Sequence, residues 1–228
     1  MSRHLSQDLS EAFHSLLRLS GQVEEMIGLA VKALVERNDA LALEMIQRDE
    51  DIDQSEVRIE EECLKMLALH QPVAADLRRV TTMMKINNDL ERMADLACNI
   101  AQRAHSVSPY PDFHIPVELH QMAGMAASMV RQSLDAFVNQ DMDHAYQVIS
   151  ADDRVDAMNV KVIDQLVEIM ARHPDSISTA LHCFSASRHI EQIADHATNI
   201  AEEVVYMISG IIVRHRRTLE DRSTNGKD

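Results

Sequence analysis

The amino-acid sequence predicts an all-α protein built as two tandem three-helix bundles, with six long antiparallel helices related by an internal repeat. Ala, Leu, Glu, Met and Gln, which are strong helix formers, dominate long stretches of the 228 residues. Only five Gly and five Pro are present, and the alternating apolar runs that are typical of strands are scarce. The repeat is visible in residues 90–103 and 190–203, because seven of these fourteen positions are identical.

The first half is expected to form three helices. Apolar residues recur with helical periodicity from about residue 5 to residue 37. Asn38 offers an N-cap for a second helix, which should continue to about His70 because Pro72 follows. A third helix is expected over residues 73–106. Each helix then has about 30 residues and a length of roughly 45 Å, and short turns make neighbouring helices antiparallel.

The second half repeats this pattern. Helices are expected over residues 117–139, 141–173 and 176–213. Asp141 offers an N-cap, and Pro174 ends a helix much as Pro72 does in the first half.

These elements divide the chain into two bundles. The first bundle is predicted to span residues 1–108, and a Pro-rich linker covers residues 109–116. The second bundle is predicted to span residues 117–213. Residues 214–228 then form a polar tail.

The composition excludes several classes of protein. A net charge of −15 argues against a nucleic-acid binder, which needs a basic surface. Cys63, Cys98 and Cys183 lack the short spacings of a disulfide framework or a zinc knuckle. Asp8 and Glu11 lie where a signal peptide would be apolar, and no run of about 18 apolar residues exists to span a membrane. We therefore expect a soluble, cytoplasmic protein.

The repeated segments place an apolar stripe beside an acidic one on the third helix of each half. In the first copy the apolar stripe consists of Leu90, Met93, Ala94, Ala97 and Ala101. Glu91, Asp95 and Asn99 follow one another at intervals of four and therefore share a neighbouring face. The second helix of each half also carries two Asp residues four apart. Antiparallel packing would bring the acidic faces of the two helices together.

We predict a metal site in each half from these carboxylates. The candidate ligands are Asp49, Asp53, Glu91 and Asp95 in the first half, and Asp152, Asp156, Glu191 and Asp195 in the second. Carboxylate oxygens suit Mg²⁺, Mn²⁺ or iron. Like charges four residues apart cost about 0.2–0.5 kcal/mol per pair, yet the arrangement occurs four times at matching positions. The alternative is that these residues form ordinary solvated helix faces.

Other candidate ligands are weaker. His189 and His196 lie seven apart on one helix, a spacing that also fits packing or surface residues. Glu11 and His14 match one half of the Glu-x-x-His pattern of di-iron bundles, but a second copy inside a helix is missing.

The doubled motif resembles that of the PhoU family of bacterial phosphate-signalling regulators, over about residues 5–213. The segments that carry the resemblance are residues 90–95, with the sequence Leu-Glu-Arg-Met-Ala-Asp, and residues 195–202, with the sequence Asp-His-Ala-Thr-Asn-Ile-Ala-Glu. The resemblance implies two similar three-helix bundles side by side, each with metal ions on its surface. Matched by motif, the ligands would be the eight carboxylates named above. The metal would be iron, zinc, manganese or magnesium.

The resemblance also implies a non-catalytic adaptor that represses the phosphate regulon when phosphate is plentiful. Its partners would be the ATPase subunit of the phosphate ABC transporter and the phosphate sensor histidine kinase. The chain would be a homodimer that reaches the inner membrane only through these partners. The rival hypothesis is a carboxylate-bridged metalloenzyme, although the sequence lacks an added His ligand set and a tuned acid or base.

Two positions depart from the pattern of the family. Met93 and Ala94 stand where the family often has Ile-Gly, and Gln192 stands where it commonly has Arg. Arg92 occupies the corresponding position of the first copy. We therefore expect the second site to lack a positive neighbour and to differ from the first in metal affinity.

Overall fold

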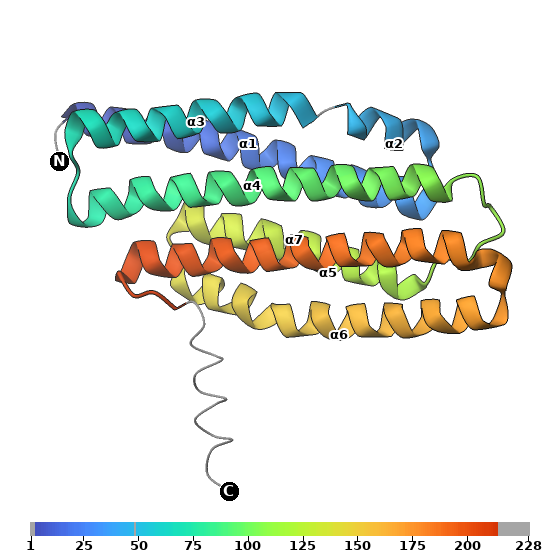
Figure 1. Ribbon diagram of the computed structural model, residues 1–228. Coiled ribbons are helices and arrows are strands. Elements are labelled where there is room, and N and C mark those ends of the chain that lie inside the picture. The colour runs from blue at the N-terminus through green and yellow to red at the C-terminus, as the bar shows by residue number, and fades with distance from the viewer. Residues whose placement is uncertain (1–2, 48, 214–228) are drawn as a thin grey trace, which may run out of the picture.

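The computed structural model describes residues 3–47 and 49–213, and the elements in this part are long helices joined by short connections (Figure 1). No strand forms among the described residues, so the predicted all-α class is confirmed. The helices, in chain order, are α1 (Arg3–Glu36), α2 (Asp39–Ile46), α3 (Asp49–His70), α4 (Ala74–Val107), α5 (Val117–Asn139), α6 (Met142–Arg172) and α7 (Ile177–Ser209). A short 3₁₀ helix, η1 (Pro174–Ser176), precedes α7.

The first half differs from the prediction in its second helix. A single helix was expected up to His70, but α2 ends at Ile46 and α3 begins at Asp49. Near this point the thiol of Cys98 on α4 donates a hydrogen bond to the carbonyl oxygen of Met45, at 3.7 Å. A carbonyl in the last turn of α2 therefore has a partner outside its own helix. The counterpart in the second half, α6, is continuous.

The predicted N-caps are present. The side chain of Asn38 accepts a hydrogen bond from the backbone N–H of Leu41 at 3.1 Å. The side chain of Asp141 accepts one from the backbone N–H of His144 at 3.0 Å. Both caps satisfy a backbone donor that the first turn of a helix leaves without a partner.

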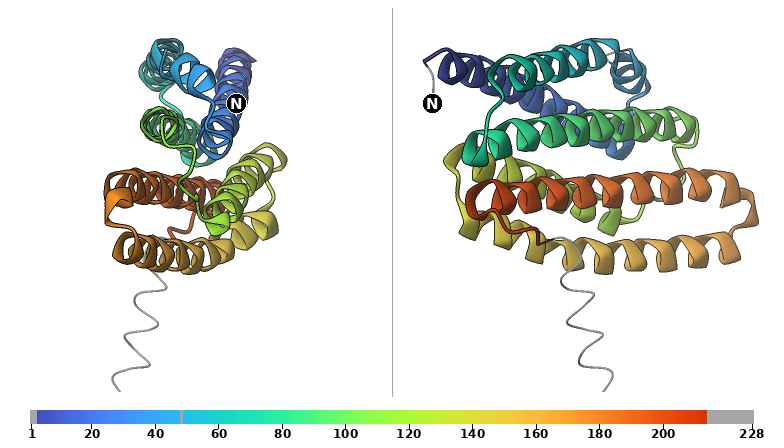
Figure 2. Two further views of the ribbon diagram at one scale, coloured as in Figure 1. Left: turned by 90° about the vertical axis from the view of Figure 1, so that its right-hand side faces the viewer. Right: turned by 60° about the vertical axis from the view of Figure 1, so that its left-hand side comes forward.

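The helices form two bundles that lie against each other (Figure 2). The first bundle contains α1 to α4 and the second contains α5 to α7. Between them, α4 and α7 lie side by side and run antiparallel, and α1 also contacts α5 (Figures 1 and 2). The outer helices α3 and α6 each pack against the central helix of their own bundle.

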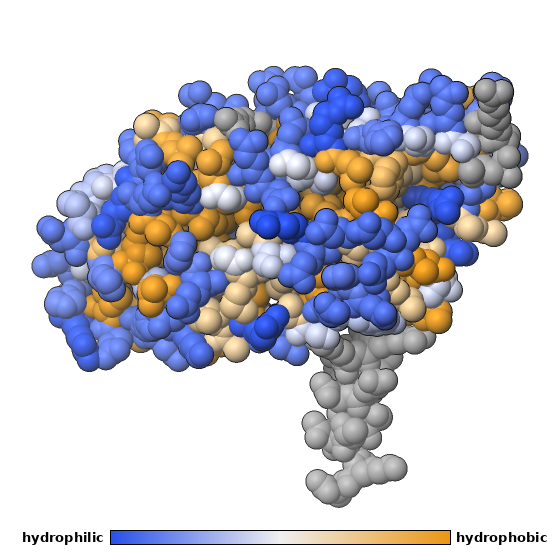
Figure 3. Space-filling model, turned by 180° about the vertical axis from the view of Figure 1, so that it is seen from behind, coloured by the Kyte–Doolittle hydropathy of each residue, from blue (hydrophilic) through white to orange (hydrophobic). Residues whose placement is uncertain are grey.

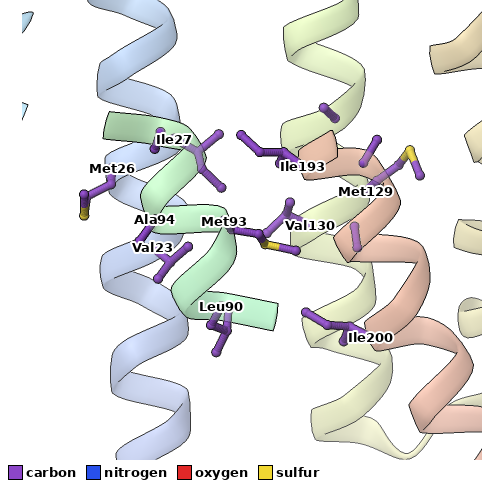
Figure 4. Close-up of a cluster of buried hydrophobic side chains, with 14 of the residues drawn as sticks. Val23, Met26, Ile27, Leu90, Met93, Ala94, Met129, Val130, Ile193 and Ile200 are labelled. Atoms are coloured by element: carbon purple, nitrogen blue, oxygen red, sulfur yellow. The ribbon is translucent and has the colours of Figure 1, made fainter. Parts of the chain in front are cut away.

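One hydrophobic core runs through both bundles. Met93 of α4 lies close to Val130 of α5, and Ile193 of α7 lies in the same cluster (Figure 4). The whole predicted apolar stripe from Leu90 to Ala101 is buried in this core. Burying these stripes leaves the acidic stripes beside them at the outer surface. Among the described helices, none has a segment long and apolar enough to cross a membrane.

Candidate functional site

The acidic residues of the first half lie together between α3 and α4. We call the surface formed by Asp53 and Glu56 of α3 and by Glu91 and Asp95 of α4 the first groove. Burial raises the pKa of Glu91, and the negative charges of Asp95, Asp53 and Glu56 raise it further. Asp53, Glu91 and Asp95 are therefore brought together as predicted. Asp49 begins α3, but its side chain lies outside the described residues.

Glu56 is a groove residue that was absent from the predicted ligands. Burial raises the pKa of Glu56, and the charges of Glu60 and Asp53 add to this effect. The side-chain amide of Asn87 on α4 donates to the backbone oxygen of Glu56 at 2.9 Å and to its Oε1 at 3.3 Å. A sequence signal for Glu56 existed, because it follows Asp53 by three residues and shares its helix face.

Arg92 is the positive charge of the first groove. Its Nε lies 3.5 Å from Oε2 of Glu91, and its Nη1 lies 3.6 Å from Oδ2 of Asp95. The charge of Arg92 lowers the pKa of Glu91 and so opposes the acidic neighbours. One exposed guanidinium therefore partly neutralises both carboxylates of the α4 motif.

The second groove lies between α6 and α7 and contains all four predicted carboxylates: Asp152, Asp156, Glu191 and Asp195. Burial, followed by the negative charges of Asp152, Glu191 and Asp156, raises the pKa of Asp195 to about 6. Asp195 nevertheless remains exposed to solvent at the edge of the groove. The four carboxylates repel one another, which is the electrostatic setting that a bound cation would relieve.

The expectation that the second groove lacks a positive neighbour is wrong. Nη1 of Arg188 contacts Oε1 of Glu191 at 2.7 Å. This arginine lies three residues before Glu191, on the same face of α7, so one helical turn separates the pair. Gln192 instead points its amide oxygen toward Nδ1 of His189, at 3.4 Å. The two grooves therefore both carry an arginine, but at different positions.

Each groove contains buried oxygen atoms that lack a hydrogen-bond partner among the described residues. Among the described residues, Oε2 of Glu191 and Oδ1 of Asn159 are buried and accept no hydrogen bond. Asn159 occupies the position of α6 that corresponds to Glu56 of α3. Oδ1 of Asn87, which lies beside Glu56, is likewise buried and accepts no hydrogen bond among the described residues. Buried acceptors of this kind are usually satisfied in proteins, and oxygen is the ligand that hard cations prefer.

The carboxylates of each groove lie near one another, but their present arrangement is too open to hold a metal ion. Within the described part of the chain, no three His, Cys, Asp or Glu side chains converge closely enough to hold a metal ion. Repulsion between like charges keeps neighbouring carboxylates apart when no cation lies between them. Binding a metal would therefore require the side chains of a groove to move toward one another.

A hollow with a mainly apolar lining lies elsewhere. A cavity of about 320 Å³ is bordered by Leu9 and Phe13 of α1, Met83 of α4, Phe137 of α5 and Met207 of α7. The ring centroids of Phe13 and Phe137 are 5.2 Å apart. Apolar residues also gather in patches on the face of the molecule seen in Figure 3. The lining of the cavity lacks a cluster of ionisable groups, so the acidic grooves are the better candidates for metal chemistry.

Comparison with known proteins gives a consistent result over almost the entire chain. The model of the PhoU domain matches twice, at residues 16–104 and 119–204. The phosphate-specific transport system accessory protein PhoU homologue of Pseudomonas putida is 38% identical, over 98% of this chain and 91% of its own. The protein of the same name from Aquifex aeolicus is also 38% identical, over 95% and 98% respectively.

Solved structures agree with the sequence comparison. The crystal structure of PhoU from Pseudomonas aeruginosa superposes with a TM-score of 0.88 and 36% identity, covering 90% of this chain and 99% of that one. The phosphate transport system regulatory protein PhoU from Streptococcus pneumoniae gives a TM-score of 0.86 at 29% identity, covering 92% and 99%. Both the doubled domain and the doubled acidic groove therefore have one explanation: the chain belongs to the PhoU family.

Proposed function

We propose that this chain regulates phosphate uptake and phosphate-starvation signalling as a non-catalytic, metal-binding adaptor. The observation that carries the proposal is the full-length match to relatives that are named accessory proteins of a phosphate-specific transport system. The chain spans nearly the whole of these relatives, so the comparison extends to both bundles and both grooves.

The metal would bind in the two acidic grooves. Asp53, Glu91 and Asp95, together with Asp49, would hold it in the first groove. Asp152, Asp156, Glu191 and Asp195 would hold it in the second. The raised pKa values of Glu91 and Asp195 support this assignment, because clustered carboxylates that repel one another gain most from a cation. Iron, zinc, manganese and magnesium all fit an oxygen-rich groove.

The partners would be the ATPase subunit of a phosphate ABC transporter and a phosphate sensor histidine kinase. By contacting both, the adaptor would keep the kinase from activating the phosphate regulon while phosphate is plentiful. The chain would act in the cytoplasm as a homodimer and reach the inner membrane only through these partners. Its net charge of −15 makes nucleic acid an unsuitable partner.

Deletion of the gene tests the regulatory role. Alkaline phosphatase activity should rise in cells grown with abundant phosphate, and the wild-type gene should restore repression. A variant with both Glu91→Gln and Glu191→Gln should restore it less well if the grooves bind a functional metal. Unchanged phosphatase activity after deletion would contradict the proposal.

Affinity capture from cells tests the adaptor role. The transporter ATPase and the kinase should be recovered with the tagged chain, and their amounts should differ between high and low phosphate. Elemental analysis of the same samples would identify the metal. If the purified, metal-loaded protein turned over phosphoesters or oxygen, and Glu91→Gln abolished the turnover, the protein would be an enzyme instead.

A further inference from the structure

The cavity of about 320 Å³ lies where the two bundles meet. Its lining comes from α1 and α4 of the first bundle and from α5 and α7 of the second. The helices α1 and α5 lie behind α4 and α7 in Figure 1 and face the viewer in Figure 3, where apolar patches interrupt the polar surface. None of the predicted metal ligands with a described side chain borders this cavity. Ligand pockets are common at such junctions between bundled helices.

The floor of the cavity is apolar. Leu9, Met83, Phe137 and Met207 border it, and each of these side chains is at most 9% exposed. The ring centroid of Phe13 lies 5.2 Å from that of Phe137, and the half-buried Phe13 ring also borders the open space. The two methionine side chains are flexible and polarizable, so the floor can adapt to apolar groups of different shape. Burying such a group here removes apolar surface of both the ligand and the floor from water.

The rim of the cavity is polar, apart from Val138. Ser6 and Ser10 of α1, Arg79 of α4 and Gln140, which follows α5, are all exposed and border the same space. Two hydroxyls, an amide and a guanidinium therefore surround the opening, whereas the buried apolar side chains lie beneath it. All four side chains can donate a hydrogen bond. The cavity thus combines an apolar floor with a rim of donors, which is the pattern of a site for an amphipathic ligand.

Arg79 gives the rim its charge. No acidic residue is among the described residues that border the cavity. The nearest paired carboxylate is that of Asp76, one turn earlier on α4, and its Oδ1 lies 4.0 Å from Nη1 of Arg79. This distance is too long for a hydrogen bond, so Asp76 offsets the charge only in part and leaves the N–H donors of the guanidinium available. The charge at the opening of the cavity is therefore positive, which favours an anionic head group over a cationic one.

The shape of the cavity favours a small molecule over a segment of a partner protein. The floor takes one buried side chain from each of four helices, so the space is a local hollow at their junction. A partner helix would need a groove that follows several turns of its neighbours, because its apolar anchors recur at intervals of three and four residues. A volume of about 320 Å³ is also near the lower end of the range for ligand pockets, which suits a short apolar chain or a single ring.

We propose that this cavity binds a small amphipathic carboxylate, with its apolar chain on the floor and its head group at Arg79. The guanidinium fork matches the two oxygens of a carboxylate, and the hydroxyls of Ser6 and Ser10 add neutral donors at the same opening. The bound molecule contacts all four helices and therefore stabilises the arrangement of the two bundles. The site is separate from both acidic grooves, and its failure would leave the proposed adaptor function unaffected.

Titration of the full-length protein with octanoate, below the concentration at which it forms micelles, tests the proposal. The methyl signals of Met83 and Met207, followed by NMR on protein with labelled methionine, report on the floor of the cavity. Met45 of α2 is equally buried but does not border the cavity, so its methyl signal is the internal reference. Octanoate should shift the first two signals in a saturable manner and leave the signal of Met45 unchanged.

Arg79→Gln separates the head group from the apolar chain. This variant should bind octanoate about three- to tenfold more weakly, because an exposed but charge-assisted contact is lost. It should bind octan-1-ol like the wild type, since the alcohol uses the same floor without a charge. The matched control is Arg58→Gln on α3, which removes an exposed arginine that donates to the backbone oxygen of Gln54 away from the cavity. This control should bind both ligands like the wild type.

A second variant fills the cavity without disturbing the core. Ser10→Trp places a large ring at an exposed position of α1 that borders the open space, so the chain should still fold. Binding of both octanoate and octan-1-ol should weaken by about tenfold or more, because the ring competes for the apolar floor. Ser128→Trp on α5 adds the same ring at an exposed serine that does not border the cavity, and it should leave both affinities unchanged.

Three outcomes would overturn the proposal. Shifts that do not saturate, or that extend to Met45, would reduce the effect to non-specific contact with apolar surface. Equal binding of octanoate by Arg79→Gln and Arg58→Gln, or equal binding of octylammonium and octanoate by the wild type, would remove the role of the guanidinium. Finally, signals of Met83 and Met207 that respond to protein concentration but not to octanoate would assign the cavity to contacts with a second copy of this chain.

Discussion

In the first groove Arg92 lies between Glu91 and Asp95, whereas in the second groove Arg188 contacts Glu191 and leaves Asp195 among acidic neighbours. The apolar stripes behind the two motifs are equally buried. The repeat therefore preserves the packing that positions the carboxylates, while single substitutions on the exposed face set their charge balance. One scaffold thus presents two grooves with different electrostatics.

The largest effects are expected from the core, where the two halves should behave alike. Leu90→Ala and Ile190→Ala each remove a fully buried side chain at equivalent positions. Each substitution is expected to lower the free energy of unfolding by about 2–5 kcal/mol, as measured by urea denaturation. Leu69→Ala, at an exposed position, is the control and should change it by less than about 0.5 kcal/mol. A near-neutral result in only one half would show that the bundles are packed differently.

Metal-binding measurements on single variants should distinguish the two grooves. Glu91→Gln is expected to weaken Mn²⁺ binding in the first groove only, and Glu191→Gln in the second only. Removing a charged ligand should cost at least the roughly 10–100-fold that is typical of changes around a metal site. Calorimetric titration of each variant should then lose one of two binding events.

The control for this experiment is Glu168→Gln, which removes an exposed carboxylate of α6 that pairs with Arg172 outside the groove. It should leave both binding events intact. If both groove variants bound Mn²⁺ like the wild type, the acidic stripes would be solvated helix faces.

The pH dependence of stability should come mainly from the second groove. The pKa of Asp195 is raised from 3.8 to about 6, so the folded state binds this proton more tightly than the unfolded state. Its contribution to the free energy of unfolding is most favourable below pH 3.8 and is lost as the pH rises through about 6. Asp195→Asn removes this dependence. The metal-free variant should be more stable than the wild type at pH 7, by up to about 1 kcal/mol after solvent screening.

Asp95→Asn provides the comparison in the first groove. Arg92 lies 3.6 Å from Asp95 and offsets the charge that the substitution removes. The metal-free variant should therefore be neutral or slightly stabilised, with a smaller gain in stability than Asp195→Asn. Urea denaturation between pH 4 and pH 8 measures both effects. A large loss of stability in either variant would indicate a structural hydrogen bond instead of repulsion.

The fold was largely predictable because it depends on local signals. Helical periodicity, the N-caps Asn38 and Asp141 and the breaks near Pro72 and Pro174 all lie within a few residues of the features they determine. The break between α2 and α3 has no nearby Gly or Pro, so it has no strong local signal. A contact from a distant helix, such as that of Cys98 with α2, becomes visible only in three dimensions.

The grooves were predictable in their main residues but not in their surroundings. The four-residue spacing identified Glu91, Asp95 and Asp195, because residues four apart on a helix share a face. Arg188 could also have been found, since it precedes Glu191 by three residues. In contrast, the amide that contacts Glu56 comes from another helix, and this contact depends on the relative placement of α3 and α4.

The smallest expected effect comes from exchanging the residues at positions 92 and 192. Gln192→Arg adds a cation beside the second groove, and Arg92→Gln removes one from the first. Both positions are exposed, so each substitution should change the free energy of unfolding by only about 0.2–1 kcal/mol, with Gln192→Arg stabilising and Arg92→Gln destabilising the metal-free protein.

Metal affinity should change in the opposite direction, because a nearby guanidinium repels the incoming cation. Arg92→Gln should therefore tighten metal binding in the first groove a few-fold, and Gln192→Arg should weaken it in the second. Both effects should shrink at about 1 M salt, because charges are then screened within roughly 3 Å. Affinity changes that persist at high salt would mean that the arginine shapes the groove through direct contacts and not through its charge.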